Sequence, residues 1–204
     1  MKSLAEHLKP SVLELGGKSP VIVFSDAGVE DAVEIAFNAA FTNMGQNCCA
    51  GTRLYIHESL HTKVIEGLKE RIEKINMGDP LLESTNYGPL CIKFLIKADL
   101  SCLEKSREMV AHAQEFNEVY QTQATLPSKG YFFPPTLILN AEDDSEIASE
   151  EVFGPVLTIL KPFHSVDEAI DRANRGIYGL AAGIVTNSQS IISKCCNEIN
   201  AGTV

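Results

Sequence analysis

The sequence predicts an α/β fold in which a largely parallel sheet is flanked by helices. Short segments rich in Val, Ile and Leu alternate with longer segments whose apolar residues recur at helical spacing. Turn and capping signals mark the ends of several of the longer segments. No internal repeat or low-complexity stretch interrupts the alternation. A pattern of this kind is typical of βαβ units and therefore of parallel strands covered by helices.

The first half of the chain supplies five expected elements. Residues 11–15 and 21–24 are expected to be short buried strands because they are rich in Val, Ile and Leu. Residues 29–41 carry apolar side chains at helical spacing, with acidic residues near the start, where the helix dipole favours them. Residues 53–57 are expected to form a strand, and 60–75 a long amphipathic helix that stops before a Gly-Asp-Pro turn.

The second half is less regular. Residues 92–116 favour a helix, followed by a loop or a weak edge strand. Residues 156–160 are expected to form a core strand, and the next helix opens with the capping box Ser165-Val166-Asp167-Glu168. Cys195 and Cys196 share an apolar stripe with neighbouring isoleucines, so both are expected in the core.

Composition narrows the class of protein. The 204 residues, 45% of them hydrophobic, suffice for one domain with a sizeable core. A net charge of -10 argues against nucleic-acid binding, and no apolar run approaches the ~20 residues of a membrane span. The six cysteines include two adjacent pairs, do not suggest a secreted disulfide framework and have no zinc-ligand spacing. We therefore expect reduced thiols, a cytoplasmic location and no metal.

Two segments carry the chemistry. Gly45-Gln46-Asn47-Cys48-Cys49 places a cysteine after a predicted helix, and Glu14-Leu15-Gly16-Gly17-Lys18 places a carboxylate on a glycine-flanked turn. A thiol needs help to become a nucleophilic thiolate, and a carboxylate on such a turn can move protons. Taken alone, the cysteine could equally be a small buried apolar residue, and the glutamate could pair with the nearby lysine.

Together and in this order, the two segments resemble the hallmark motifs of the aldehyde dehydrogenase superfamily. The resemblance implies that Cys48 is the nucleophile that attacks an aldehyde and passes through a thiohemiacetal and a thioester. It implies that Glu14 is the general base for thioester hydrolysis. Cys49 lies beside the nucleophile and is expected to pack or to act as an oxidation-sensitive neighbour.

A third motif, Glu150-Glu151-Val152-Phe153-Gly154-Pro155, continues the resemblance. It implies that Glu151 accepts hydrogen bonds from the nicotinamide ribose of NAD or NADP, and that Phe153 supports the nicotinamide. Leu15 and Gly16 are the further expected cofactor contacts. Without the resemblance, this motif would be an acidic loop before a core strand. Residues 91–123 depart from the family pattern, and no site is expected there.

The resemblance covers nearly the whole chain, whereas the chain corresponds to the catalytic half of the family. Residues 1–204 are therefore expected to form a single, partial catalytic domain without a complete dinucleotide-binding domain. The expected reaction is NAD(P)-dependent oxidation of a small aldehyde to a carboxylic acid, in a protein that is a homo-oligomer when intact. Two alternatives stay open: a catalytically incompetent fragment that associates with a full-length relative, and a cofactor-independent thiol esterase.

Overall fold

The computed structural model describes residues 2–91 and 102–204, and its centre is a six-stranded sheet. The strand order is β3-β4-β5-β2-β1-β6; all neighbouring pairs are parallel except the antiparallel pair of β3 and β4 at one edge. The expected α/β class with a largely parallel sheet is confirmed. The strands are β1 (Pro20–Val23), β2 (Arg53–Ile56), β3 (Glu118–Gln121), β4 (Thr136–Ala141), β5 (Val156–Leu160) and β6 (Gly183–Val185).

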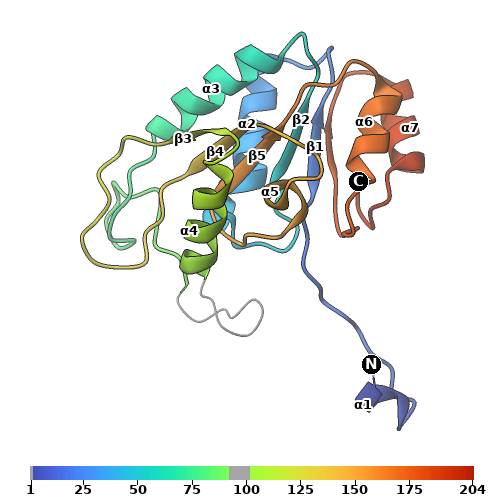
Figure 1. Ribbon diagram of the computed structural model, residues 1–204, viewed down its shortest axis with the longest axis horizontal. Coiled ribbons are helices and arrows are strands. Elements are labelled where there is room, and N and C mark those ends of the chain that lie inside the picture. Colours follow the sequence, from blue (N-terminus) through green and yellow to red (C-terminus); the bar gives the residue numbers. More distant parts are fainter. Residues whose placement is uncertain (1, 92–101) are drawn as a thin grey trace.

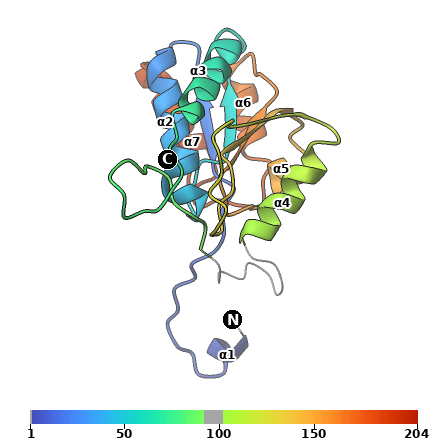
Figure 2. The ribbon, with the colours of Figure 1, turned by 90° about the vertical axis from the view of Figure 1, so that its left-hand side faces the viewer.

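Helices cover both faces of the sheet (Figures 1 and 2). One face packs against α2 (Val29–Phe41) and α3 (His61–Glu73). The other packs against α4 (Cys102–Ala113), α5 (Glu146–Ser149), α6 (Val166–Ala173) and α7 (Gln189–Glu198). A 3-10 turn, η1 (Thr42–Gly45), follows α2, and the short helix α1 (Lys2–Ala5) lies away from the body of the molecule in both views.

The sheet is apolar on both faces because each face lies beneath helices. In β1, Val21 and Val23 point into the cluster beneath α2 and α3, whereas Ile22 points into the cluster on the opposite face. All three side chains are buried. This two-sided burial explains why the strands appear in the sequence as continuous apolar runs without polar alternation.

The expected strand at 11–15 is wrong. Residues 9–19 form no regular secondary structure, and Val12, Leu13 and Leu15 are largely exposed. An apolar run becomes a strand only where a neighbouring strand takes its backbone hydrogen bonds, and β1 begins at Pro20 between β2 and β6. The apolar composition of this segment therefore predicted burial that the described chain does not provide.

Most other expected elements are confirmed. The long amphipathic helix is α3, and the weak edge strand after the irregular region is β3. Ser165 caps α6 by accepting a hydrogen bond from the Glu168 N–H at 3.2 Å. Cys195 is buried but Cys196 is exposed, because adjacent helical residues lie about 100° apart; the core expectation for Cys196 is wrong.

Two further observations complete the fold. Of the helix expected over 92–116, the structure shows α4 from Cys102 to Ala113, and positions 92–101 lie outside the described residues. Among the residues that the structure describes, no helix is both long and apolar enough to cross a membrane.

Candidate active site

Cys48 lies beyond α2 and follows the η1 turn (Thr42–Gly45), whose backbone is unusual. Asn43 and Met44 have φ values of 53° and 57°, in the left-handed region, and Gly45 follows at 70°. A Cβ added to Gly45 would lie 2.3 Å from the carbonyl oxygen of Gly154. The turn therefore packs directly against the backbone of the Glu150–Pro155 motif, and the close approach requires glycine.

The two thiols of this segment have different surroundings. Cys48 is half-buried, and Cys49 is exposed, so Cys49 does not pack as expected. The Cys49 thiol and backbone N–H both approach the Asn47 side-chain oxygen, at 3.3 Å and 3.4 Å. The Cys48 sulfur lies 3.9 Å from the same oxygen. Asn47 therefore holds the exposed thiol more closely than the expected nucleophile.

The glycine pair joins the cysteine segment to the acidic motif. The Gly17 N–H donates to Glu151 Oε1 at 3.1 Å. A Cβ on Gly17 would lie 2.2 Å from the Cys48 carbonyl oxygen, and one on Gly16 would lie 2.4 Å from Glu151 Oε2. Three segments far apart in the sequence thus meet at one point, where two glycines leave room for a backbone carbonyl and a carboxylate.

The Glu151 carboxylate is held from several sides. Burial raises the pKa of this carboxyl, while the Gly17 N–H and the positive charges of Lys18 and Lys105 act in the opposite direction. Burial raises the pKa of the nearby Tyr178 hydroxyl, and the Glu151 backbone acts in the opposite direction. One carboxylate oxygen accepts from Gly17, and the other lies so close to Gly16 that only glycine leaves room for it.

Lys18 is the most unusual charged group near the site. Its side chain is 1% exposed, and its ammonium nitrogen has no hydrogen-bond partner among the described residues. Burial lowers the pKa of Lys18 to about 7, the Arg53 guanidinium acts in the same direction, and the Glu151 carboxylate acts against both. The alternative in which Lys18 pairs with Glu14 is therefore wrong.

Arg53 anchors the chain that carries Lys18. Its side chain is buried and donates to the Lys18 carbonyl at 2.7 Å, to the Tyr55 hydroxyl at 3.2 Å and to the Ala173 carbonyl at 3.0 Å. These bonds connect the start of β1 to β2 and to the end of α6. The glycine pair therefore begins a segment whose position is fixed by a buried guanidinium.

The other expected site residues lie at the margin of this meeting point. Glu14 and Leu15 are exposed in the irregular segment before Gly16, and among the described residues Glu14 forms no hydrogen bond or ion pair. Phe153 is partly buried against the core and has a φ of 58°, which is rare for a bulky residue. The structure thus brings Gly16, Cys48 and Glu151 together and leaves Glu14 in solvent.

Sequence reasoning missed the residues that support the site. Lys18, Arg53 and Tyr178 belong to no motif that names their contacts, although Lys18 stands two residues before an apolar strand, which is a signal for burial. Within 2–91 and 102–204, no three His, Cys, Asp or Glu side chains are grouped to hold a metal ion.

Comparison with known proteins identifies the family. The sequence profile described as the aldehyde dehydrogenase family matches residues 1–204. The chain belongs to the aldehyde dehydrogenase family. It is 43% identical over 199 residues to a mitochondrial aldehyde dehydrogenase, family 2 member B4, of Arabidopsis thaliana, which covers 97% of this chain and 36% of the relative. It is 42% identical over 203 residues to the betaine aldehyde dehydrogenase of Brucella anthropi, covering 100% of this chain and 41% of that enzyme.

Solved structures of aldehyde dehydrogenases share the fold. The NAD⁺ complex of the Bacillus cereus aldehyde dehydrogenase superposes with a TM-score of 0.89 at 36% identity, over 100% of this chain and 40% of that one. The 3,6-anhydro-L-galactose dehydrogenase complex gives 0.88 at 34% identity, over 99% and 42%. The family is one of oxidoreductases, and this chain spans about two fifths of the length of these relatives.

Proposed function

We propose that residues 1–204 form the catalytic domain of an aldehyde dehydrogenase that oxidises an aldehyde to a carboxylic acid with NAD or NADP. The observation that carries the proposal is the meeting of the Gly16–Gly17 turn, the Cys48 backbone and the Glu151 carboxylate. All three family motifs converge there, although they are separated by up to 134 positions in the sequence.

Cys48 is the proposed nucleophile. Its sulfur forms a bond to the aldehyde carbon as the carbonyl oxygen takes up a proton, which gives a thiohemiacetal; loss of that proton and of a hydride then leaves a thioester. Water then attacks the thioester carbon, Glu14 accepts the proton of that water, and the Cys48 thiolate leaves as the carboxylic acid forms. Glu14 is exposed, so this role requires the irregular segment before Gly16 to bring its carboxylate to the thioester.

The nicotinamide cofactor would be held by Glu151, Phe153, Leu15 and Gly16. The fit rests on the placement of the Glu151 carboxylate: Gly17 holds one oxygen, and the other lies where a side chain at position 16 would be. A carboxylate so placed suits two vicinal ribose hydroxyls. When bound, the cofactor supplies the hydride acceptor. Solved relatives include NAD⁺ complexes and an NADP dependent enzyme of Escherichia coli, so both forms belong in the test.

Substrate, assembly and compartment extend the proposal. Relatives are named for benzaldehyde, betaine aldehyde and 4-trimethylaminobutyraldehyde. By analogy with these relatives, we propose that the substrate is a small aldehyde. A homo-oligomer and a cytoplasmic location are proposed with it. Five of the cysteines, Cys48, Cys49, Cys91, Cys195 and Cys196, are free thiols, as a reducing compartment maintains them, although two plant relatives are named mitochondrial.

The test follows the acyl group on the protein. The chain is incubated with benzaldehyde or betaine aldehyde and with NAD or NADP, then quenched in acid and mapped by mass spectrometry. The proposal expects acylation of Cys48 and formation of reduced cofactor, both lost in Cys48→Ser and retained in the matched variant Cys49→Ser. Acylation of another cysteine, or reduced cofactor from Cys48→Ser at the wild-type rate, would refute the assignment.

A second measurement separates the oxidoreductase from the thiol esterase. An activated ester such as p-nitrophenyl acetate acylates Cys48 without cofactor in either case. Only the dehydrogenase also acylates Cys48 from an aldehyde, and only when NAD or NADP is present. Glu14→Gln should then slow release of the acyl group by about 10²–10⁴-fold.

A further inference from the structure

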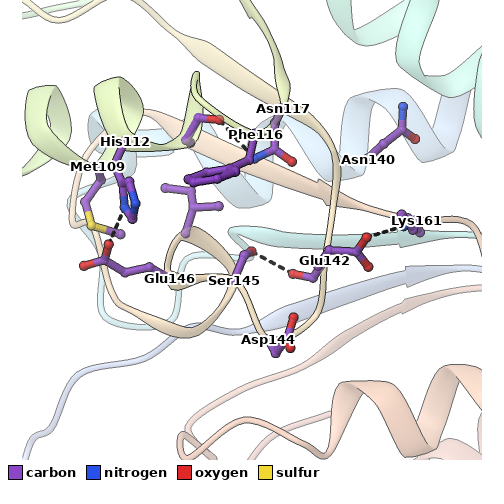
Figure 3. A pocket seen from close by; sticks show the side chains of 12 residues that line it. Met109, His112, Phe116, Asn117, Asn140, Glu142, Asp144, Ser145, Glu146 and Lys161 are labelled. Carbon is purple, nitrogen blue, oxygen red and sulfur yellow. Dashed lines mark hydrogen bonds and ion pairs between the residues drawn. The ribbon is translucent and has the colours of Figure 1, made fainter.

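A pocket lies on the surface between α4 and the turn that precedes α5, away from the glycine pair. Its volume is about 390 Å³, which lies in the range of small-molecule sites. Figure 3 shows Phe116 across this pocket from Ser145 and Glu142, with His112 and Glu146 at one end and Lys161 at the other. These residues are distinct from the proposed active site.

The floor of the pocket is apolar. Met109, Ala113 and Ile147 line it, and each is at most 5% exposed because each also belongs to the core between the helices and the sheet. A thioether and two aliphatic side chains offer contacts to alkyl groups and no hydrogen bonds to water. The floor therefore favours a ligand with a hydrocarbon body.

One wall of the pocket is an aromatic ring in solvent. Phe116 is 76% exposed, although a phenyl side chain gains free energy when it leaves water. Its ring meets the His112 ring edge to face, with centroids 5.6 Å apart, and the His112 Nδ1 lies 2.7 Å from Glu146 Oε2. This chain of contacts supports the ring at the pocket. An exposed aromatic face is the preferred surface for a cation without strongly bound water.

The opposite rim carries negative charge. Glu142, Asp144 and Glu146 contribute three carboxylates, against one ammonium, Lys161, which pairs with Glu142. Glu146 pairs with His112. The Asp144 carboxylate forms no hydrogen bond or ion pair with any other residue that the structure describes, so its charge is available to a ligand. The apolar floor, the aromatic wall and the negatively charged rim are together complementary to a cation that carries alkyl groups.

We propose that this pocket binds a small organic ammonium ion, with its alkyl groups on Met109 and Ile147 and its positive charge between the Phe116 ring and the Asp144 carboxylate. The position has a structural consequence. α5 forms one side of the pocket and continues directly into Glu150 and Glu151, so a bound ligand would rest on the helix that leads to the cofactor carboxylate.

The test compares ligands of one shape that differ in charge. Choline, its neutral carbon isostere 3,3-dimethylbutan-1-ol and the anion 3,3-dimethylbutanoate are titrated into the purified chain. Binding is followed by the NMR signals of the Met109 methyl group and the Phe116 ring. We expect choline to bind at least about fivefold more tightly than the neutral isostere, since a cation–aromatic contact contributes about 1 kcal/mol. The anion should be weaker than both.

Variants of the protein test which side chains contact the positive charge of choline. Phe116→Leu keeps the apolar bulk but removes the aromatic face, and should weaken choline about fivefold while changing the neutral isostere little. Asp144→Asn should weaken choline at least about twofold, whereas Glu83→Gln, an equal charge change on an exposed loop, should leave it unchanged. Circular dichroism confirms that each variant is folded.

Three outcomes would overturn the proposal. The first is equal affinity for choline and its neutral isostere, and the second is tighter binding of the anion. The third is that choline, raised to about 20 mM, causes no saturable shift of the Met109 and Phe116 signals; this concentration is roughly twentyfold above a millimolar dissociation constant. Each result concerns binding alone. The proposed dehydrogenase function is tested on Cys48 and stands or fails separately.

Discussion

Replacing Lys18 by Met should stabilise the protein, and more so at low pH. Burial lowers the pKa of Lys18 to about 7 from an ordinary value of 10.5. The unfolded chain therefore binds a proton more tightly than the folded protein, so stability rises with pH between about 7 and 10.5. The pKa difference corresponds to about 5 kcal/mol, which is the cost of keeping this ammonium charged in the folded state below pH 7.

The free energy of unfolding can be measured in urea at pH 6 and pH 9. At pH 6 nearly all of this unfavourable free energy is present in the wild type, and at pH 9 about 2 kcal/mol of it remains. The gain in the free energy of unfolding from Lys18→Met should therefore be about 2–3 kcal/mol smaller at pH 9 than at pH 6. Met keeps the length and apolar stem of the side chain. Using the difference between variant and wild type cancels the pH-dependent contributions that the two proteins share.

Lys63 provides the matched control because it lies exposed on α3. Lys63→Met should change stability by less than about 0.5 kcal/mol at both pH values. The reasoning fails if Lys18→Met gives the same change in free energy at pH 6 and pH 9, because a neutral or solvated Lys18 would carry no charge cost to release. It also fails if the variant is less stable than wild type at pH 6.

Three further predictions concern packing and charge. Gly45→Ala should destabilise the fold by about 1–3 kcal/mol and slow iodoacetamide labelling of Cys48, because the added methyl group would meet the Gly154 carbonyl at 2.3 Å; unchanged labelling and stability would contradict this contact. Leu68→Ala should cost about 2–5 kcal/mol in a urea titration, because Leu68 is fully buried between α3 and the sheet, whereas an exposed site such as Leu81→Ala should change little. Glu151→Gln removes the carboxylate that favours the Lys18 ammonium and should lower the pKa of Lys18 further, so the pH-dependent rise in stability should begin at a lower pH; a transition at the wild-type pH would show that the two groups do not interact.

The sequence predicted the sheet and its helices because those elements depend on local periodicity. The strands at 21–24, 53–57 and 156–160 are apolar on both faces, and the structure buries them between two helical layers. The same criterion failed at 11–15, where apolar side chains have no neighbouring strand. Periodicity in the sequence indicates which residues can be buried. Which of them are buried depends on whether the fold places a strand or helix beside them.

The motifs predicted which residues would matter but not how they are held. The hydrogen bond between Gly17 and Glu151 joins residues 134 positions apart, and no local pattern encodes a contact over that separation. The burial of Lys18 depends in the same way on Arg53, whose guanidinium reaches three separate elements. Met109 and Phe116, on one side of the pocket, belong to the segment that departs from the family pattern, so the resemblance gave no indication of that side.

The tight contacts at Gly17 and Gly45 limit how this region can move. Each glycine touches a carbonyl oxygen of another segment with no space for even a methyl group, so none of the three segments can slide without displacing the next. Fluctuations at this point must therefore be collective. The amides of Gly17 and Gly45 should exchange with deuterium in a single cooperative step, while the exposed segment before Gly16 exchanges freely. Access for a substrate must then come from motion of that outer segment, around a centre that opens as a whole or not at all.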